Sequence, residues 1–306
     1  MLALSRLVAP RGAAVGARGF ATEKEIAMRI TATKNIRKIT ASMKMVSASK
    51  LRGDQNRLDV AKKFGAWTDK LSPAATPFEE IKDVAFLPQK NVIIAVSSDK
   101  GLCGGVHSNV ARNLRNLCGK TDAAGKEVSI ICVGDKARSQ LKRMVSAKLN
   151  CAFTDIQLPY SFALAGEVAA KTAEFADADA VHIAFNVFKS AIAYSPSLKT
   201  IAPFVRDGEG ETLQKYEFEE EGDARSRVEV MANLYSYYVA TEIYYAMMEG
   251  QTSEQSSRMQ AMENASKNAG ELIDKLTLLY NRARQARITT ELIEIISGAS
   301  ALEKPR

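Results

Sequence analysis

The sequence predicts an α/β protein with a coiled coil, in which long antiparallel N- and C-terminal helices form a stalk around an inserted Rossmann-like α/β domain. Three observations predict this fold. Two long segments near the chain ends contain no proline and have helical periodicity. Buried strand-like runs alternate with helical patterns between these segments, and a length of 306 residues suits about two structural units.

The first 20 residues (1–20) have the composition of a mitochondrial transit peptide. Arg6, Arg11 and Arg18 are their only charged residues, so removal of the segment lowers the net charge from +7 to +4. Pro10 and the arginines interrupt the apolar run that a secretory signal needs. A disordered basic tail is the alternative interpretation. We expect the mature chain to begin near Ala21.

The composition excludes several broad classes. With 46% hydrophobic and 25% charged residues, the chain is not wholly disordered. Its longest uncharged stretch, Val230 to Thr241, is shorter than the roughly 20 residues of a spanning helix. The four cysteines form no C-x-x-C pair, and we expect free thiols. Only His107 and His182 are available for a zinc site or a histidine-dependent nucleophile, which argues against both.

Residues 21–80 contain the predicted N-terminal stalk helix. No proline and only two glycines occur between Glu23 and about Leu71, so one long helix is expected there. Three prolines then predict a linker over residues 72–89. An apolar row in the helix has 3, 4, 3 spacing: Ile36, Ile39, Met43 and Val46.

Residues 81–206 form the predicted α/β foot domain. Continuous apolar runs predict buried strands at Asn91–Ser97, Glu127–Val133 and Ala180–Phe188. A glycine-rich turn follows the first of these strands, and a helical pattern then extends to Leu117. Further helices are predicted at Asp135–Ser146 and Phe162–Ala176. A hairpin is expected around Ser195-Pro196.

Residues 207–223 are an acidic connector with eight acids and one base, and residues 224–306 form the predicted C-terminal stalk helix. This helix carries a ten-position 3, 4 repeat without a charged residue, which predicts a coiled-coil seam. The seam positions are Met262, Ala265, Ala269, Leu272, Leu276, Leu279, Ala283, Ala286, Thr290 and Ile293.

The two stalk helices differ in predicted length. At 1.5 Å per residue the first would reach ~75 to 87 Å and the last ~117 Å, so the last should extend beyond its partner. Its overhanging end carries large aliphatic side chains that another molecule must enclose. They are Ile288, Leu292, Ile295, Ile296 and Leu302.

The first helix also has a strongly basic segment. Seven bases and no acid occur between Ile26 and Gly53. This pattern predicts either that the helix binds an acidic surface or that the bases form a solvated face. A coiled-coil nucleic-acid-binding protein is the alternative function, although no aromatic residues lie among the bases to stack on nucleotides. The bases are Arg29, Lys34, Arg37, Lys38, Lys44, Lys50 and Arg52.

The glycine-rich segment Ser97–Gly105 follows a strand and precedes a helix, which is the context of a phosphate-binding loop. Its pattern matches neither the P-loop nor the dinucleotide fingerprint, because the lysine precedes the glycines. We therefore interpret the glycines as allowing a tight turn and close backbone packing, with a nucleotide-dependent enzyme as the less favoured alternative.

Three blocks together resemble the gamma-subunit family of F-type ATP synthases, over essentially the whole mature chain. They are ITATKNIRKITASMKMVSASKL at Ile30–Leu51, SDKGLCGGVHSN at Ser98–Asn109 and ITTELIEIISGAS at Ile288–Ser300. The transit segment points to a mitochondrial member.

The resemblance implies a non-catalytic rotor. The terminal helices would form the central shaft inside a hexamer of alpha and beta subunits, and the foot would meet the delta and epsilon stalk subunits and the membrane c-ring. Proton flow would turn the ring and the shaft, and the shaft would cycle the catalytic beta subunits. No cofactor, nucleic acid or small-molecule substrate is implied, and the location would be the matrix side of the mitochondrial inner membrane, as a peripheral subunit.

The resemblance also implies site residues. Arg284, Gln285 and Thr289 would engage a loop of a beta subunit, where long donors can form charge-assisted hydrogen bonds. The acidic lever of the beta subunits would face Met43, Lys44 and Lys50. An apical sleeve would surround Leu292, Ile295, Ile296 and Leu302 with nondirectional apolar contact.

Overall fold

The computed structural model describes residues 23–71, 74–81, 83–175, 178–204 and 227–302. The predicted transit segment and the acidic connector lie outside these residues. The chain divides into two compact units that share the two long helices. One unit, Ile39–Ser266, contains the α/β domain; the other combines Met1–Lys38 with Lys267–Arg306 and contains the far ends of both helices.

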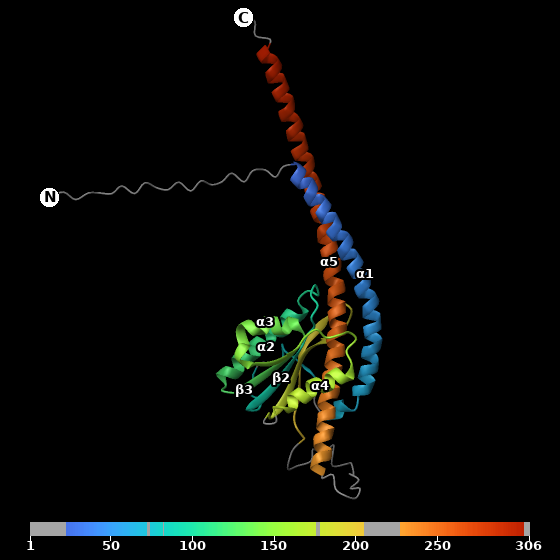
Figure 1. The fold of residues 1–306 in the computed structure, drawn as a ribbon, viewed down its shortest axis with the longest axis vertical. Helices are drawn as coiled ribbons and strands as arrows, with labels where there is room; N and C mark the ends of the chain where they lie inside the picture. The colour runs from blue at the N-terminus through green and yellow to red at the C-terminus, as the bar shows by residue number, and fades with distance from the viewer. Residues whose placement is uncertain (1–22, 72–73, 82, 176–177, 205–226, 303–306) are drawn as a thin grey trace, which may run out of the picture. The chain divides into compact units, whose positions relative to one another are not determined.

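The two predicted stalk helices are α1 (Glu23–Gly65, 43 residues) and α5 (Arg227–Leu302, 76 residues) (Figure 1). The α/β domain contributes strands β1 (Thr76–Pro77), β2 (Lys90–Val96), β3 (Glu127–Val133), β4 (Leu149–Phe153), β5 (Ala180–Phe188) and β6 (Tyr194–Ile201). Its helices are α2 (Val106–Ala123), α3 (Asp135–Val145), α4 (Phe162–Ala173) and the short 3₁₀ turns η1 (Thr68–Lys70) and η2 (Ser146–Lys148).

The strands form one mixed sheet in the order β1-β6-β5-β2-β3-β4. The four strands β5, β2, β3 and β4 are parallel, and β6 and β1 continue the sheet antiparallel to their neighbours. The central strand β2 is buried from Asn91 to Val96, as its continuous apolar run predicts. Gly134, after β3, has φ +96°, and a Cβ atom there would lie 2.7 Å from the backbone of Ser97 and Ser98.

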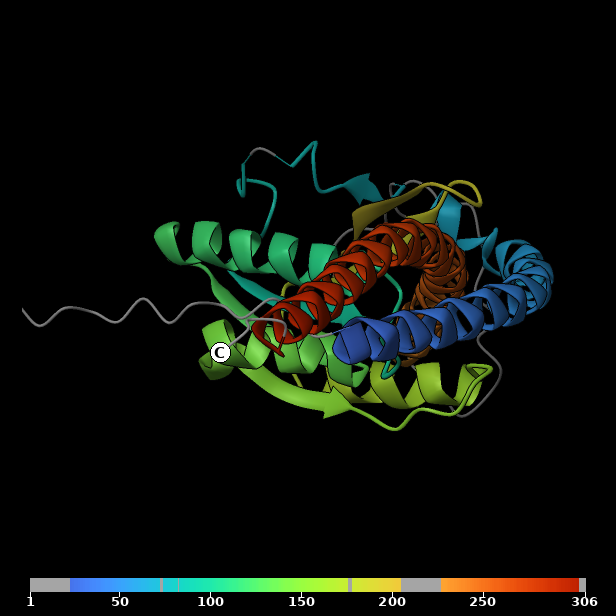
Figure 2. The same ribbon diagram turned by 90° about the horizontal axis from the view of Figure 1, so that it is seen from above.

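Each face of the sheet has its own apolar core. Alternate residues of β2 belong to different cores. Ile93 and Ala95 pack with α2 and α3, whereas Val92, Ile94 and Val96 pack with α4, α5 and the end of α1. Figure 2 shows α2 (green) and α4 (yellow-green) well separated, as helices covering opposite faces must be. Helix α5 is therefore a structural part of the α/β domain and covers one face of its sheet.

Three predictions about the domain need correction. The first helix ends at Gly65 rather than near Leu71, where the Thr68 hydroxyl donates to the Gly65 carbonyl at 2.6 Å and a 3₁₀ turn follows. The predicted linker contains β1 and the buried Leu87, so part of it belongs to the domain. Ser195-Pro196 lies within β6, and the hairpin turn is at 189–193.

The buried row of α1 differs from the predicted one. Ile36, Ile39 and Val46 are each more than half exposed, although they have helical spacing. Besides Leu51 and Leu58, the helix buries a position every seven residues, and these residues are mostly small or polar, which lets α5 approach closely. These positions are Ile26, Thr33, Thr40, Ser47, Asp54 and Ala61.

The coiled-coil seam of α5 keeps several of its predicted positions and differs by one residue at two others. Met262 and Ala269 are buried as predicted. Ile273 is buried at 9% exposure, whereas Leu272 and Leu279 are 48% and 46% exposed. Ile273 and the partly buried Tyr280 therefore replace Leu272 and Leu279, whereas the predicted Leu276 and Ala283 are partly buried. The predicted positions Ala286, Thr290 and Ile293 are exposed, so the seam does not reach them.

All four cysteines, at positions 103, 118, 132 and 151, are free thiols, as expected. Among the described residues, no helix combines the length and the hydropathy that a bilayer crossing requires.

Candidate functional site

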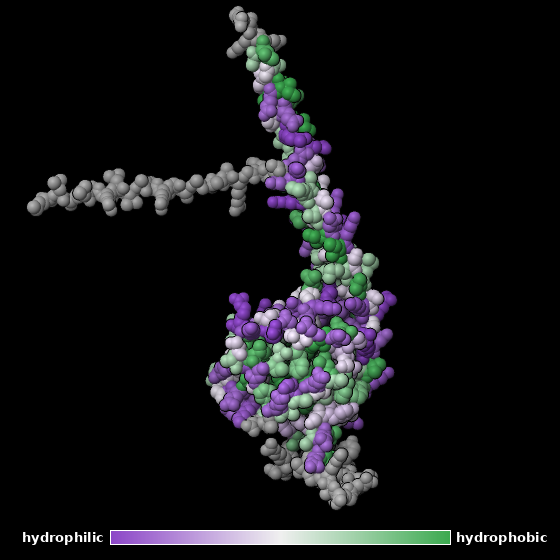
Figure 3. Space-filling view, viewed as in Figure 1, coloured by the Kyte–Doolittle hydropathy of each residue, from purple (hydrophilic) through white to green (hydrophobic). Residues whose placement is uncertain are grey.

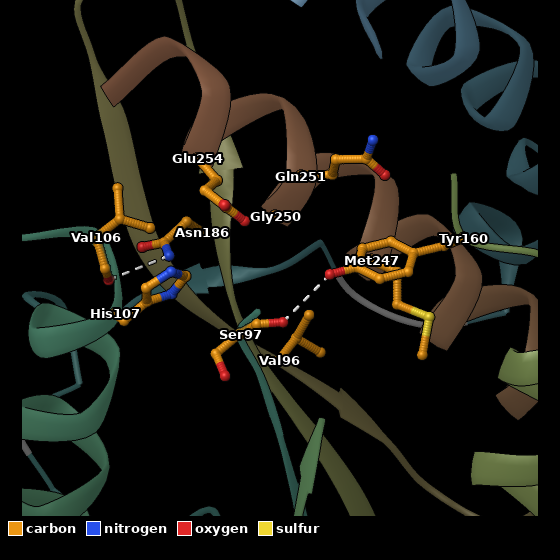
Figure 4. Close-up of a pocket in the computed structure, with 10 residues that line it drawn as sticks. All are labelled: Val96, Ser97, Val106, His107, Tyr160, Asn186, Met247, Gly250, Gln251 and Glu254. Carbon is orange, nitrogen blue, oxygen red and sulfur yellow. Dashed lines mark hydrogen bonds between the residues drawn. The ribbon is translucent and has the colours of Figure 1, made fainter. Parts of the chain in front are cut away.

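Strands β2 and β5 end at a crevice where the strand order reverses, the place where open α/β sheets usually bind their ligands. Helix α5 lies across this crevice (Figure 4). A cavity of about 10 Å³ remains, which is about the smallest volume that has room for one water molecule. Its lining joins the sheet and α2 to α5: Val96, Ser97, Val106, His107, Tyr160, Asn186, Met247, Gly250, Gln251 and Glu254.

The crevice is polar but closed. The Tyr160 hydroxyl donates to the Ser97 carbonyl and the Asn186 amide donates to the Val106 carbonyl, each at 3.4 Å. His107 Nε2 lies 3.2 Å from Ser98 Oγ, and burial lowers the pKa of His107. A neutral imidazole is therefore held inside the domain, where it supports packing.

The part of α5 that fills the crevice is unusual for a buried helix. Residues 249–258 read EGQTSEQSSR and contain no apolar side chain, yet eight of the ten are buried. Thr252 and Ser253 have no exposed surface. We call residues 249–258 the polar segment. A helix that is polar on every side is normally solvated, so its burial must rest on specific polar contacts.

The polar segment contacts the sheet through β5 and the turn after it. Glu249 Oε2 accepts from the Phe188 backbone N–H at 2.6 Å, and Glu249 Oε1 accepts from the Tyr245 hydroxyl at 2.7 Å. The Ser253 hydroxyl donates to the Asn186 carbonyl at 3.2 Å. The Ser256 hydroxyl donates to the Ala191 carbonyl at 2.7 Å.

The glycine-rich segment also belongs to this contact. The Ser257 hydroxyl donates to the Cys103 carbonyl at 2.6 Å, and Arg258 Nε donates to the Gly101 carbonyl at 3.3 Å. Gly104 has φ +64°, and a Cβ atom there would lie 3.2 Å from Ser257 Oγ. The glycines therefore serve a tight turn and close packing against α5, as the sequence indicated.

Helix α1 covers the polar segment from another side. The Gln251 side-chain amide donates to Asp54 Oδ1 at 2.8 Å, and Lys62 Nζ lies 3.6 Å from Glu249 Oε1. Figure 4 shows Gln251 pointing away from the cavity. Asp54 is 4% exposed, and burial raises the pKa of its carboxyl group.

The sequence-predicted residues of α1 lie outside this cluster. Met43 is partly buried, and Lys44 Nζ lies 3.1 Å from Glu263 Oε1, so Lys44 contacts α5 of its own chain. Lys50 is exposed. Of the two lysines, Lys50 is therefore the one with no ion pair among the described residues.

The predicted polar residues of α5 lie in the other unit. Arg284, Gln285 and Thr289 are all exposed, and the side chains of Arg284 and Gln285 form no hydrogen bond or ion pair within the described part of the chain. The Thr289 hydroxyl donates to the Gln285 carbonyl at 2.9 Å. Gln285 and Thr289 are four residues apart and share a helix face.

The predicted apolar residues at the end of α5 are uncovered. Glu23 begins α1 and its carboxylate lies 3.2 Å from Arg287 Nε, so α1 accompanies α5 no further than this pair. Every residue from 284 to 302 of α5 is exposed, and Figure 3 shows hydrophobic side chains at the surface there. The exposed fractions are 52% for Ile288, 55% for Leu292, 69% for Ile295, 56% for Ile296 and 89% for Leu302.

The sequence-based reasoning missed the polar segment. Its residue types gave no sign of burial, because hydrophobic periodicity is the main signal for a buried helix face. One local signal was present: small hydroxyl residues recur at 252, 253, 256 and 257, where large side chains would be expected on a solvated helix.

Comparison with known proteins gives consistent results. The ATP synthase family model matches residues 22–302. The rat mitochondrial ATP synthase F(1) complex subunit gamma is 44% identical over 285 residues, covering 92% of this chain and 100% of the rat protein. The mitochondrial ATP synthase subunit gamma of Ipomoea batatas is 40% identical over 297 residues, covering 94% of this chain and 87% of the Ipomoea protein.

Solved structures share the fold. A chain of the Tetrahymena thermophila mitochondrial ATP synthase central stalk and c-ring structure has a TM-score of 0.59 and 29% identity, covering 74% of this chain and 99% of that chain. A chain of the Euglena gracilis mitochondrial ATP synthase OSCP/F1/c-ring structure has a TM-score of 0.72 and 20% identity, covering 92% of this chain and 94% of that chain.

Proposed function

This chain belongs to the ATP synthase gamma-subunit family, and from that membership we propose how its two long helices work. The chain is the central-stalk rotor subunit of the mitochondrial proton-translocating ATP synthase. It couples rotation driven by proton flow to the conformational cycling of the catalytic beta subunits. A nucleic-acid-binding role for the basic helix is therefore the disfavoured alternative.

The observation that carries the mechanism is the uncovered apolar end of α5. Leu292, Ile295 and Ile296 are more than half exposed in the chain alone, and each large aliphatic side chain that a partner buries contributes roughly 1.5 to 3 kcal/mol. Apolar contact has no preferred direction, so a helix end enclosed in this way can turn. We assign Leu292, Ile295, Ile296 and Leu302 to a bearing formed by the alpha and beta subunits.

Below the bearing, exposed polar residues suit contacts that form and break during rotation. Arg284 and Gln285 can donate to a loop of one beta subunit, in charge-assisted bonds worth roughly 1.5 to 3 kcal/mol for the arginine. Thr289 lies on the same face of α5 as Gln285 and completes this contact. Its hydroxyl already donates to the Gln285 carbonyl at 2.9 Å, so it is the weakest of the three donors.

On α1, we propose that the acidic lever of the beta subunits meets Lys50, with Met43 supplying apolar contact. Lys44 would have to exchange Glu263 for the lever, which an exposed ion pair allows because such pairs contribute little stability. The partly exposed Ile36, Ile39 and Val46 supply further apolar surface on this helix.

We propose that the chain holds no catalytic site. The crevice that would bind a nucleotide is filled by α5 and leaves about 10 Å³, whereas ligand pockets measure roughly 300 to 1,000 Å³. Its partners would be the alpha and beta subunits at the shaft, and the delta and epsilon subunits and the c-ring at the foot. The subunit would be peripheral, on the matrix side of the inner membrane.

The first experiment is reconstitution of alpha and beta subunits with the chain from Ala21 to Arg306, compared with a version truncated after Arg287. We expect one full-length chain to co-purify with each hexamer and to raise ATP turnover, and the truncation to weaken both effects. Failure of the full chain to bind contradicts the rotor. Equal behaviour of the truncated chain contradicts the bearing alone.

A second experiment tests the beta-subunit contact. Arg284→Ala with Gln285→Ala should slow coupled ATP turnover while the thermal unfolding of the free chain stays unchanged, because both side chains are exposed. Lys275→Ala with Asp274→Ala, two exposed residues of the same helix, is the matched control. Unchanged turnover in a fully assembled double variant contradicts the role.

A further inference from the structure

The polar segment joins α5 to the α/β domain by directional contacts on several sides of one helix. Hydrogen bonds or ion pairs run to β5 through Glu249 and Ser253, to the glycine-rich segment through Ser257 and Arg258, and to α1 through Gln251. Because each bond needs a defined donor–acceptor geometry, together they allow only one angle and one height of the helix.

Glu249 is the central group of this arrangement. Its side chain is 1% exposed, and its two oxygens contact the Phe188 backbone N–H, the Tyr245 hydroxyl and the Lys62 ammonium. A rotation or a one-turn shift of α5 would leave a buried carboxylate without these partners. Removal of partners from a buried charge is strongly unfavourable, whereas apolar side chains can exchange neighbours with little loss.

We propose that the polar segment is a register lock, which fixes α5 against rotation and sliding in the α/β domain and carries turning force between the two, with Glu249 as its principal positioning residue. This inference rests on the proposed rotor function. A shaft must turn inside its bearing yet stay fixed in its foot, and directional polar contacts provide the fixed end. Buried polar groups are best known for setting the register of packed helices.

The test uses the complete ATP synthase in membrane vesicles and measures proton pumping per ATP hydrolysed. Glu249→Ala should keep ATP hydrolysis within about twofold but lower the pumping ratio at least about fivefold. The buried partners of Glu249 lose their acceptor in this variant, so α5 is no longer held in one position and can slip within the α/β domain. Glu249→Gln keeps one acceptor for Phe188 N–H and should recover most of the ratio. Glu271→Ala changes an exposed acid of the same helix and should have no effect.

A covalent link should replace the lock. The Ser256 hydroxyl lies 2.7 Å from the Ala191 carbonyl oxygen, so the two backbones are close, and Ser256→Cys with Ala191→Cys is the cysteine pair to test, with disulfide formation checked by loss of free thiol. In a Glu249→Ala background, oxidation of this pair should restore the pumping ratio and reduction should abolish it again. A pumping ratio that stays normal in Glu249→Ala, or that oxidation does not restore, overturns the proposal.

A second measurement separates the lock from the rotor function. In the free full chain, the amide hydrogens of Phe188 and of residues 249–258 should exchange slowly, and Glu249→Ala should speed exchange at Phe188 at least about tenfold. Fast exchange in the unmodified chain overturns the lock. If exchange is as expected but the unmodified chain fails to couple in vesicles, the rotor function has failed and the lock remains.

Discussion

Two regions of helix α5 reverse the usual relation between polarity and burial. The polar segment at 249–258 contains no apolar side chain and is almost entirely buried. Residues 288–302 carry isoleucines and leucines that are at least half exposed. Burial in this helix therefore follows the kind of contact that each region makes rather than its hydrophobicity.

The two kinds of contact suit two different tasks, a fixed position in the α/β domain and turning inside a partner. Hydrogen bonds at the polar segment have preferred directions, so they hold α5 in one position within the α/β domain. Apolar contact at 288–302 has no preferred direction and permits turning inside a partner. In the free chain, substitutions in the two regions should therefore change stability by very different amounts.

The largest effect is expected from the same substitution placed in the two regions. Ser253→Leu inserts a large side chain where no surface is exposed and removes the bond to Asn186, so the free energy of unfolding should fall by about 3 kcal/mol or more. Ser297→Leu, at an exposed position, should change it by less than about 0.5 kcal/mol. Urea unfolding of both variants measures the contrast, and equal losses would refute it.

A charge in the helix seam should have the next largest effect. Ile273→Asp buries a carboxylate between α1 and α5 and should destabilise this helix pair by about 2 to 3 kcal/mol. Leu279→Asp, which the 3, 4 repeat places in the same seam, should cost less than about 1 kcal/mol because Leu279 is 46% exposed. Amide exchange over residues 23–38 reports the pair, and a larger effect at 279 contradicts the observed seam.

Asp54→Asn should have a smaller effect, because it removes a buried charge from the contacts of the polar segment while keeping an oxygen for Gln251. Burial raises the pKa of Asp54 above 3.8, so the folded chain binds its proton more tightly than the unfolded chain. The contribution of Asp54 to stability is therefore highest below pH 3.8 and falls as pH rises through the folded pKa.

The Asp54→Asn variant should accordingly be about 0.5 to 1 kcal/mol more stable than the unmodified chain at pH 7, and close to it at pH 3.5. Urea unfolding at both pH values checks the sign. A variant that is less stable at pH 7 would show that the ion pair with Arg57 outweighs the desolvation of Asp54.

The smallest effect on the free chain is expected at the apolar end. Leu292→Ser with Ile296→Ser should change the free energy of unfolding by less than about 0.5 kcal/mol, because both side chains are more than half exposed. The same variant should bind the alpha and beta subunits more weakly. Normal assembly would show that these residues form no bearing.

The sequence predicted the elements whose signal is local. The runs Glu127–Val133 and Ala180–Phe188 are strands with the predicted bounds, because continuous apolar residues suit a strand buried on both faces. The uncovered end of α5 was also predictable, since the two predicted helix lengths alone show that α5 extends beyond α1.

The elements that depend on a distant partner were not predictable. Ile273 replaces Leu272 in the seam because the position of α1 decides which neighbour faces inward, and both residues are apolar. The polar segment is buried because carbonyl groups of residues 101, 103, 186 and 191 lie near the ends of the strands and accept its hydrogen bonds. Nothing in the local pattern of residues 249–258 encodes those acceptors.

The placement of α5 over the sheet also sets the order in which the chain can fold during synthesis. The core on that face of the sheet includes residues from 238 to 248, and the crevice at the strand ends is closed by residues up to 254. All five of the longer strands end by Ile201 and are therefore synthesised before these residues. One apolar face of the nascent domain, which α4 and the end of α1 cover only in part, therefore stays incompletely covered until α5 emerges, and the domain needs protection from aggregation for that interval.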